Sequence, residues 1–293
     1  MTVSVAIIAM AGQADLRACL DALRTQAGAP DLDIVAVYEP HLPNMDAVSA
    51  DYPEVRLLPN TGQQSPLELA SIAIRETRGA RVLVTKDYCR PAPDWAAQLL
   101  ATLDEDCAAA GGPVRLPDTG GAVSWAFSYL DFFPYTGRQE NTDAATLTVC
   151  NAAYRRADLE ALSLDWKSHF QETAVNEALK ALRAQPLRLN PQAPVTMVRD
   201  LSLQDALHER YALGRVFAAK RLEYASARQR WVYRLGAPAL PPLMMSRMAN
   251  KALRDPESRP VFLKSLAPLS AMVLARAAGE WLGYVTGQPP GPS

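Results

Sequence analysis

The first 115 residues alternate short apolar runs with amphipathic stretches, which predicts alternating strands and helices. The apolar runs predict strands at Val3–Ala9, Ile34–Tyr38, Val55–Leu58, Arg81–Thr85 and Ala108–Val114. Apolar residues recur at helical spacing in Asp15–Gln26, Ser65–Thr77 and Pro93–Leu103. This order is typical of a mostly parallel sheet covered by helices, so the sequence predicts an α/β fold.

The rest of the chain is less regular at first and then becomes helical. Residues 120–160 hold an aromatic cluster, which either packs in a core or lines a groove for an acceptor. A helix is predicted at Glu172–Leu182 and a short strand at Val195–Met197. We therefore expect an α/β domain over residues 1–200 and a helical extension over residues 201–293.

Composition excludes several classes of protein. Hydrophobic residues make up 49% of the chain and charged residues 21%, which is ordinary for a folded protein. With Lys+Arg 30 against Asp+Glu 31, the chain is not a globally basic nucleic-acid binder, and no nucleic-acid partner is expected. The four cysteines form no CxxC pair, which favours reduced thiols in a cytosolic setting.

The helical extension differs from the rest of the chain in charge. Residues 210–254 contain ten Lys or Arg and one acid, Glu223, and they lie beside apolar stretches. Such a pattern favours helices that lie on an anionic membrane surface, which predicts a peripheral protein on the cytoplasmic, inner face. The late charge-free runs, Leu235–Ser246 and Ser265–Ala275, are too short to cross a bilayer. A buried helical pair or a dimer interface is the alternative.

The ends of the predicted strands indicate where a ligand would bind. In open parallel sheets, ligands lie at the carboxyl ends of the strands. The residues that follow the first, second and fourth strands are Ala9–Gly12, Glu39–His41 and Lys86–Arg90. Glycine-rich dinucleotide, phosphate-loop and GxSxG motifs do not occur in the sequence, which disfavours other nucleotide enzymes and hydrolases.

Several motifs follow one another along the chain, namely VSVAIIAMAGQADLRACLDAL, Tyr38-Glu39-Pro40, TKDYCRPAPDW, GGPVR, SWAFSYLDFFPY, TVCNAAYRR and HFQETAVNEAL. Over roughly residues 3–225, their order resembles family 2 glycosyltransferases with the GT-A fold. The late basic helix HERYALGRVFAAKRL and the closing AGEWLGYVTG resemble peripheral-membrane members. The resemblance implies a Rossmann-like central sheet and an extension that associates with the membrane.

The resemblance also implies an activity. It is the transfer of a sugar, with inversion, from a nucleotide-diphosphate donor to a lipid-linked or saccharide acceptor, as in cell-envelope polysaccharide synthesis. Glu172 would be the catalytic base, which takes the proton of the acceptor hydroxyl. The residues implied to hold the nucleotide sugar are Ala9, Glu39, Lys86, Asp87, Asn151, Arg210 and Arg215.

The metal site departs from the family pattern. The family's acidic motif ends in its metal ligand, and this chain has Lys86-Asp87-Tyr88 there. A second family ligand aligns near Met197, and a family Arg aligns with Ala70. Tyr and Met suit Mg²⁺ or Mn²⁺ poorly, so Asp87 is left as the candidate metal ligand and we expect weak or absent metal dependence. Lys86 could neutralise the diphosphate instead.

Each candidate residue also has a structural interpretation. Glu172 suits a helix N-terminus, Asp87 a helix cap and Asn151 a loop that bonds its own backbone. The departures at the metal site also favour a second hypothesis. The chain could be a catalytically silent GT-A domain that acts as a membrane-associated binding or scaffold protein.

Overall fold

The computed structural model describes residues 2–60, 65–117, 120–136, 142–223 and 225–287, which form two compact units. Unit 1 consists of Met1–Arg115 and Arg138–Arg199. Unit 2 consists of Leu116–Gly137 and Asp200–Ser293. The sequence placed a boundary near residue 200, and the structure adds that Leu116–Gly137 belongs with the C-terminal helices.

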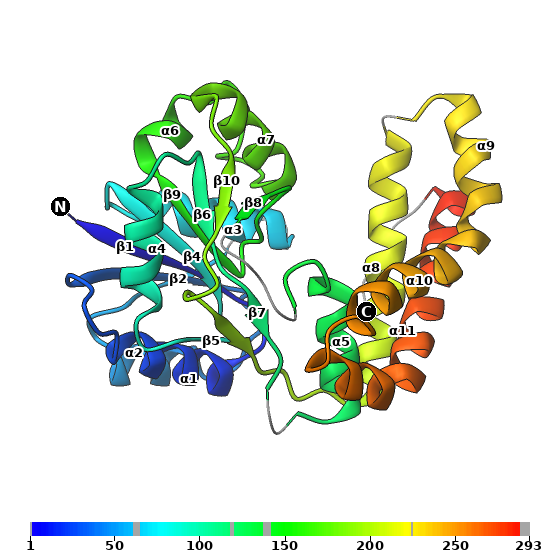
Figure 1. The fold of residues 1–293 in the computed structure, drawn as a ribbon, viewed down its shortest axis with the longest axis horizontal. Coiled ribbons are helices and arrows are strands. Elements are labelled where there is room, and N and C mark those ends of the chain that lie inside the picture. Colours follow the sequence, from blue (N-terminus) through cyan, green and yellow to red (C-terminus); the bar gives the residue numbers. More distant parts are fainter. Residues whose placement is uncertain (1, 61–64, 118–119, 137–141, 224, 288–293) are drawn as a thin grey trace. The chain divides into compact units, whose positions relative to one another are not determined.

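Within the described residues, unit 1 is built on an eight-stranded sheet of order β3-β2-β1-β4-β9-β6-β10-β8 (Figure 1). Its strands are β1 (Val3–Ala9), β2 (Leu32–Tyr38), β3 (Arg56–Pro59), β4 (Arg81–Lys86), β6 (Ala109–Gly111), β8 (Thr142–Ala144), β9 (Asn151–Arg155) and β10 (Leu187–Leu189). Neighbouring strands from β3 to β4 are parallel, as are β6 and β10, whereas β9 is antiparallel to β4 and β6 and β8 to β10. The predicted α/β fold class is confirmed.

Helices cover the sheet because its strands are apolar on both faces. The helices of unit 1 are α1 (Gln13–Arg24), α2 (Met45–Asp51), α3 (Pro66–Glu76), α4 (Trp95–Leu103), α6 (Arg156–Glu160) and α7 (Glu172–Arg183). All seven residues of β1 are buried. Ala6 and Ile8 pack in one core with Leu69 of α3 and Val175 of α7. Alternation along the strand therefore directs Val5 and Ile7 to the other face.

A second, smaller sheet lies beside the first in unit 1. It contains β5 (Cys89–Pro91), β11 (Val195–Met197) and β7 (Val114–Arg115), in the order β5-β11-β7. The predicted strand Ala108–Val114 is thus divided between β6 and β7. At Gly112 the chain passes so close to the segment before β11 that an added Cβ would lie 1.8 Å from the Ala193 carbonyl oxygen. Only glycine fits there.

Unit 2 is helical, and two of its helices cross in direct backbone contact. Its elements are α5 (Ala122–Phe132), α8 (Leu203–Glu223), α9 (Ala227–Gly236), the 3-10 turn η1 (Ala237–Ala239), α10 (Leu240–Ala252) and α11 (Ser258–Thr286). α8 and α11 run side by side (Figure 1). A Cβ at Gly279 would lie 2.1 Å from the Tyr211 carbonyl oxygen, and one at Gly214 would lie 2.3 Å from that of Arg276. Glycine at these positions therefore lets the two backbones touch.

Among the described residues, α11 alone is long and apolar enough to cross a membrane by length and composition. The sequence treated this region as shorter runs, because Lys264 and Arg276 interrupt it. In the structure the helix continues through both charges for 29 residues. Glu280 is 4% exposed and pairs with Arg276 at 3.2 Å.

The aromatic cluster of α5 contributes to the core of unit 2. Tyr129 donates a hydrogen bond to the Ser258 carbonyl oxygen at 3.0 Å. Its ring meets that of Phe262 edge-on, with 5.5 Å between centroids. Phe127 and Tyr129 are both buried, so packing rather than a groove explains these two members of the cluster.

Candidate active site

The carboxyl ends of β1, β2 and β4 bring together the first group of predicted residues. In the register of the sheet, Ala9 lies opposite Tyr38, and Ile8 lies opposite Lys86. Ala9, Glu39 and the Lys86-Asp87 pair therefore meet at one edge of unit 1. This is the edge at which the sequence predicted a ligand.

Asp87 is buried at this edge and fixes the loop that follows β1. One carboxylate oxygen accepts hydrogen bonds from the backbone N–H groups of Met10 at 2.8 Å and Ala11 at 2.6 Å. The other oxygen accepts from the N–H of Tyr88 at 3.1 Å. The side chain is 0% exposed. Asp87 thus fixes the loop that follows β1. Its carboxylate accepts hydrogen bonds from backbone amides rather than contacting a sugar or a metal.

Replacing Asp87 by Asn should change how stability depends on pH. Burial raises the pKa of Asp87 from 3.8 to about 6, although the Ala11 and Met10 amides oppose the rise. The folded chain therefore holds a proton between about pH 4 and pH 6 that the unfolded chain has lost, and wild-type stability falls as the pH rises through this window. Because Asn does not titrate, the variant should gain up to about 3 kcal/mol of unfolding free energy relative to wild type between pH 4 and pH 7.

Urea unfolding at pH 4.5, 5.5 and 7 measures this difference. Asp46→Asn, on the exposed side of α2, is the matched control for the change of charge. Parallel pH profiles for wild type and the Asp87 variant would contradict the assigned burial effect.

Tyr88 occupies the position of the family's metal ligand and is surrounded by cations. The Lys86 ammonium lies 5.5 Å from the centre of its ring, and the Arg199 guanidinium lies 5.4 Å from it. The side chain is 4% exposed, and burial raises the pKa of Tyr88 well above its ordinary value, so the phenol stays protonated.

Arg199 follows β11 and was not identified from the sequence. In the sequence, the only indication of its role is that it is a basic residue just after a short strand.

The residues of this edge do not fit a divalent metal ion. A protonated phenol is a poor ligand, the Asp87 carboxylate bonds backbone amides, and the thioether of Met197 is buried and soft. No group of three or more His, Cys, Asp and Glu side chains in the described part of the chain could hold a metal. Positive charge at this edge comes from the protein itself.

Glu172 is brought to the same edge by the start of α7. It is the first residue of that helix, and its carboxylate accepts a hydrogen bond from the N–H of Val149 at 2.8 Å. Burial alone would lower the pKa of Lys86, but Tyr88, Cys150 and Glu172 raise it more, so Lys86 stays charged at neutral pH. Val149 precedes Cys150, whose carbonyl accepts a hydrogen bond from the Thr85 hydroxyl at 3.0 Å, and Thr85 precedes Lys86, so Glu172 is held near the end of β4. The predicted base and the predicted cation lie in one cluster.

Glu39 follows β2 and lies near His41. Its carboxylate is 3.3 Å from the His41 Nε2, and its side chain is 13% exposed. The carbonyl of the preceding residue, Tyr38, accepts a hydrogen bond from Asn60 at the end of β3. Glu39 is thus held at the strand ends, and its contact with the nucleotide sugar stays a prediction.

Asn151 does not face this edge with a free group. Its side-chain oxygen accepts a hydrogen bond from the Trp95 indole at 2.8 Å. Its amide nitrogen donates to the carbonyls of Pro113 at 3.1 Å and Ala193 at 2.8 Å. The residue is 1% exposed. The expected bond to a sugar hydroxyl is replaced by a link between β9, α4 and the strands of the small sheet.

Arg210 and Arg215 belong to α8 in unit 2. The guanidinium of Arg210 is 2% exposed, pairs with Asp131 and with Glu209 at 2.8 Å, and lies over the Phe127 ring. Its charge is therefore neutralised within unit 2, where the sequence had predicted a contact with the diphosphate. Arg215 is half-buried where Gly283 of α11 meets the backbone of α8.

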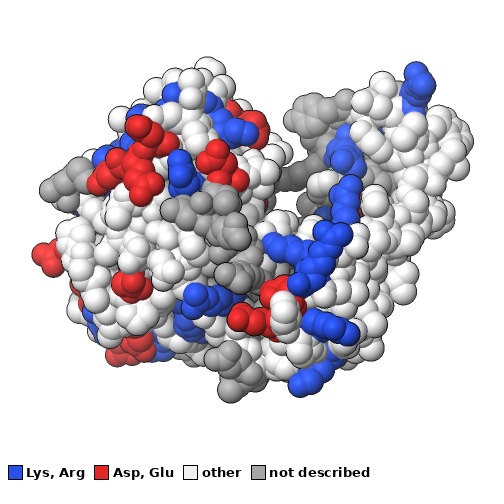
Figure 2. Space-filling view, viewed as in Figure 1, with Lys and Arg blue, Asp and Glu red and all other residues white. Residues whose placement is uncertain are grey.

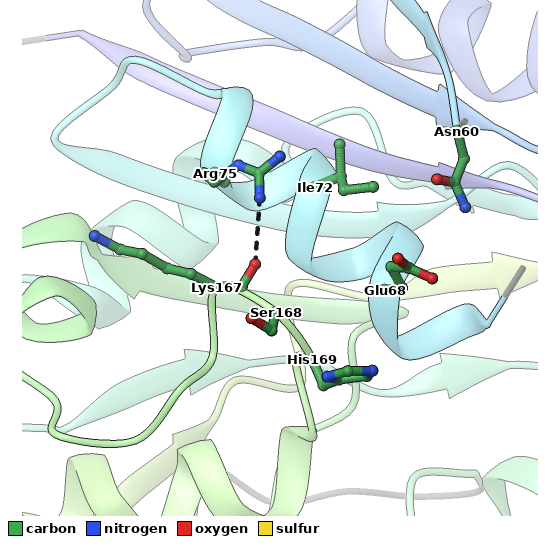
Figure 3. Close-up of a pocket in the computed structure, with 7 residues that line it drawn as sticks. All are labelled: Asn60, Glu68, Ile72, Arg75, Lys167, Ser168 and His169. Atoms are coloured by element: carbon green, nitrogen blue, oxygen red, sulfur yellow. Dashed lines mark hydrogen bonds between the residues drawn. The ribbon is translucent and has the colours of Figure 1, made fainter. Parts of the chain in front are cut away.

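A polar pocket of about 320 Å³ opens in unit 1 between α3 and the segment that precedes Glu172 (Figure 3). Arg75 donates a hydrogen bond to the Lys167 carbonyl oxygen at 3.4 Å across it. The lining residues are Asn60, Glu68, Ile72, Arg75, Lys167, Ser168 and His169. His169, three residues before Glu172 in the chain, is an exposed member of this lining.

Solved structures share this architecture. No family model and no curated protein sequence matches the chain. A mannosyltransferase from Pyrobaculum calidifontis, in complex with GDP-Man and Mn²⁺, aligns at 15% identity with a TM-score of 0.55, covering 95% of this chain and 86% of that one. TarS of S. aureus (residues 1–349), in complex with UDP-GlcNAc, aligns at 13% identity with a TM-score of 0.52, covering 94% and 91%.

The chain has the GT-A fold. Its structural neighbours are GT-A glycosyltransferases at low identity, so the comparison establishes the fold alone. Within that fold, Glu172, Lys86, Tyr88 and Arg199 form the candidate site, and Ala9 and Glu39 border it. Val149, which bonds Glu172, and Cys150 belong to the motif TVCNAAYRR, but the sequence analysis selected only Asn151 from it.

Proposed function

We propose that this chain is a glycosyltransferase that moves a sugar from a nucleoside diphosphate to an acceptor hydroxyl, with inversion at the sugar carbon. Glu172 accepts the hydroxyl proton while the acceptor oxygen bonds to that carbon. The bond from the carbon to the diphosphate oxygen breaks, and the nucleoside diphosphate leaves with the electron pair. Each step uses a group at the carboxyl ends of the sheet.

The proposal depends on one observation: the hydrogen bonds of Val149 to Glu172 and of Thr85 to Cys150 hold Glu172 near the end of β4, where Lys86 lies in a GT-A sheet. The transfer needs a base at the acceptor and positive charge at the leaving group. A carboxylate held by a backbone amide and a half-buried ammonium meet these two needs. Packing alone does not require a carboxylate and an ammonium at the same edge of the sheet.

In the proposed reaction, Lys86 and Arg199 stabilise the charge of the diphosphate in place of a metal. An ammonium acts as a point charge, and a guanidinium can bond two phosphate oxygens. Both groups lie within 5.5 Å of the Tyr88 ring centre. We include UDP and GDP sugars as donor classes because structural neighbours bind UDP-GlcNAc and GDP-Man. The acceptor we propose is a lipid-linked or saccharide hydroxyl.

A second candidate is favoured because three residues that were expected to contact the ligand instead bond other groups of the protein. Asp87, Asn151 and Arg210 all bond groups of the protein. A silent GT-A domain that binds a partner would retain these packing bonds and have no donor to bind. The two candidates differ in one measurable property, which is affinity for a nucleoside diphosphate.

Calorimetry with UDP, GDP, UDP-GlcNAc and GDP-Man distinguishes them. The transferase should bind at least one of these in EDTA, with little gain on adding Mn²⁺ or Mg²⁺. Binding that requires the metal would overturn the role of Lys86 and Arg199. An absence of binding under both conditions would leave the silent domain.

Replacing Lys86 by Met should weaken nucleoside diphosphate binding about 10- to 100-fold, because a hydrogen-bonded charge at the phosphate is lost. Met retains the length of the side chain, so packing beside Tyr88 is largely kept. Affinity for the nucleoside without phosphate should not change, which separates a charge effect from a packing effect. Lys180→Met, on α7 of the same unit, is the matched control. Equal diphosphate affinities in the Lys86 variant and wild type would exclude the proposed contact.

A further inference from the structure

α9 and α10 of unit 2 combine exposed apolar side chains with charge of a single sign. Residues 224–254 contain six cations and no Asp or Glu. The cations are Arg228, Arg230, Arg234, Arg247, Lys251 and Arg254. Of the fifteen exposed large hydrophobic side chains among the described residues, thirteen belong to unit 2. The proposed transfer chemistry in unit 1 uses none of them.

The most exposed apolar side chains of unit 2 lie on one face of α9. Trp231 is 61% exposed, Val232 is 59% exposed and Leu235 is 76% exposed. At 100° per residue these three positions fall within about 100° of the helix surface. The opposite face carries Tyr233, whose ring lies 5.4 Å from that of Tyr284 in α11. α9 therefore has one face in the unit's own core and one face without cover from the described residues, which is apolar except for the exposed Arg228.

The cations beside this face keep their charge. Arg230 bonds the Leu222 and Ala225 carbonyls at 3.0 and 3.1 Å, and Arg234 bonds the Tyr284 carbonyl at 2.8 Å. These partners are neutral, so the guanidinium charge is oriented but not cancelled. Figure 2 shows Lys and Arg in a row on unit 2, bordering a surface that is largely uncharged.

α11 adds a second apolar stripe in the same unit. Positions spaced three and four apart lie on one side of a helix. In α11 this stripe is Leu263, Ala267, Ser270, Leu274, Ala278, Trp281 and Val285. It contains no charge, and Leu274 and Trp281 are 58% and 48% exposed. The stripe spans 22 residue steps, or about 33 Å of helix.

We propose that the exposed face of α9, together with α10, lies on the surface of an anionic phospholipid bilayer. Trp231, Val232 and Leu235 enter the headgroup region, and the exposed cations Arg228, Arg247 and Arg254 contact lipid phosphates. Trp favours this depth because its ring is apolar and its N–H is polar. The inference is independent of the transfer chemistry.

Charge favours a bilayer over a second copy of the chain. A twofold contact through this face would place the same patch on both sides, so cations would oppose cations. An anionic bilayer supplies negative charge and an apolar interior at the same surface. Both properties of the α9 face are then matched by one partner.

Flotation of the full chain with vesicles tests the proposal. The protein should bind vesicles of phosphatidylcholine with one quarter phosphatidylglycerol and bind pure phosphatidylcholine far less. Removing each cation should lower partitioning about fivefold, so Arg228→Glu combined with Arg247→Glu should lower it at least 25-fold. Trp231→Ser combined with Leu235→Ser should also abolish flotation. The matched controls in unit 1, Leu182→Ser and Arg115→Glu, should float as wild type does.

Fluorescence provides a second test of the membrane contact, and it does not need a variant that removes the apolar side chains. Trp231→Phe keeps an apolar ring, so the variant should still float. Quenching of Trp emission by lipids labelled in the headgroup region should be smaller for this variant than for wild type.

Four outcomes of the flotation and quenching assays would overturn the proposal. They are an absence of binding to anionic vesicles, equal binding to both vesicle types, wild-type flotation of the Trp231/Leu235 double variant, and unchanged quenching in Trp231→Phe. If light scattering shows a dimer that the double variant converts to a monomer, without vesicle binding, the face joins two copies instead. Binding that survives alkaline carbonate would mean that a helix crosses the bilayer, which also contradicts a surface-bound α9.

Discussion

Replacing Glu172 by Gln is expected to lower turnover by about 10²- to 10⁴-fold, because Gln cannot accept the proton of the acceptor hydroxyl. The variant should fold normally, since the Gln oxygen can still accept the hydrogen bond from the Val149 N–H. Loss of negative charge in the first turn of α7 costs at most about 1 kcal/mol. Affinity for the donor should be nearly unchanged, because the base acts on the acceptor.

Release of UDP or GDP from whichever donor binds is the measurement, combined with calorimetry on the same variant. Glu177→Gln is the matched control, since Glu177 is an exposed acid of the same helix that pairs with Lys180. It should retain full activity. If the Glu172 variant turns over as fast as wild type, another group is the base and the proposed mechanism is wrong.

Replacing Asn151 by Ala is expected to lower the free energy of unfolding by about 3 to 5 kcal/mol. The change leaves two buried groups without this partner, namely the Trp95 indole N–H and the Ala193 carbonyl, whereas the Pro113 carbonyl keeps the hydrogen bond from the Val195 N–H. Each such group costs about 1 to 3 kcal/mol when it is buried and unpaired. Chemical denaturation at neutral pH measures the loss.

Asn151→Asp separates a structural role from a role in sugar binding. Asp has the same shape, but its second oxygen would face two carbonyl oxygens instead of donating to them. We therefore expect it to destabilise the fold, whereas a residue that bonds sugar hydroxyls would tolerate it in the free protein. Asn250→Ala, at an exposed position of α10, should leave stability nearly unchanged. A stable Asp variant would contradict the structural role of Asn151.

The parallel half of the sheet could be predicted because its strands are buried on both faces. β1, β2 and β4 appear in the sequence as continuous apolar runs, a pattern that surface strands lack. The start of α3 could also be predicted from the sequence, since Ser65 caps the helix and Pro66 is its first residue. β9 could not be predicted in the same way. It is short and antiparallel, and its place between β4 and β6 depends on partners distant in sequence.

The positions of Lys86 at a strand end and Glu172 at a helix start could be predicted, because strand ends and helix starts follow from local patterns. The roles of both residues stay predictions. Arg199 was not identified, since a single Arg after a three-residue strand resembles any surface Arg. What made it a candidate is its position over Tyr88.

The sequence by itself determined which residues form strands and helices, and which residues follow the strands of a parallel sheet. Only the tertiary structure decided what the polar side chains bind. Asp87 and Met10 are 77 residues apart, Asn151 and Trp95 are 56 apart, and Arg210 and Asp131 are 79 apart. A buried polar group must be satisfied, and a ligand or a distant segment of the chain can do this equally well. Local sequence is the same in both cases, so the fold alone distinguishes them.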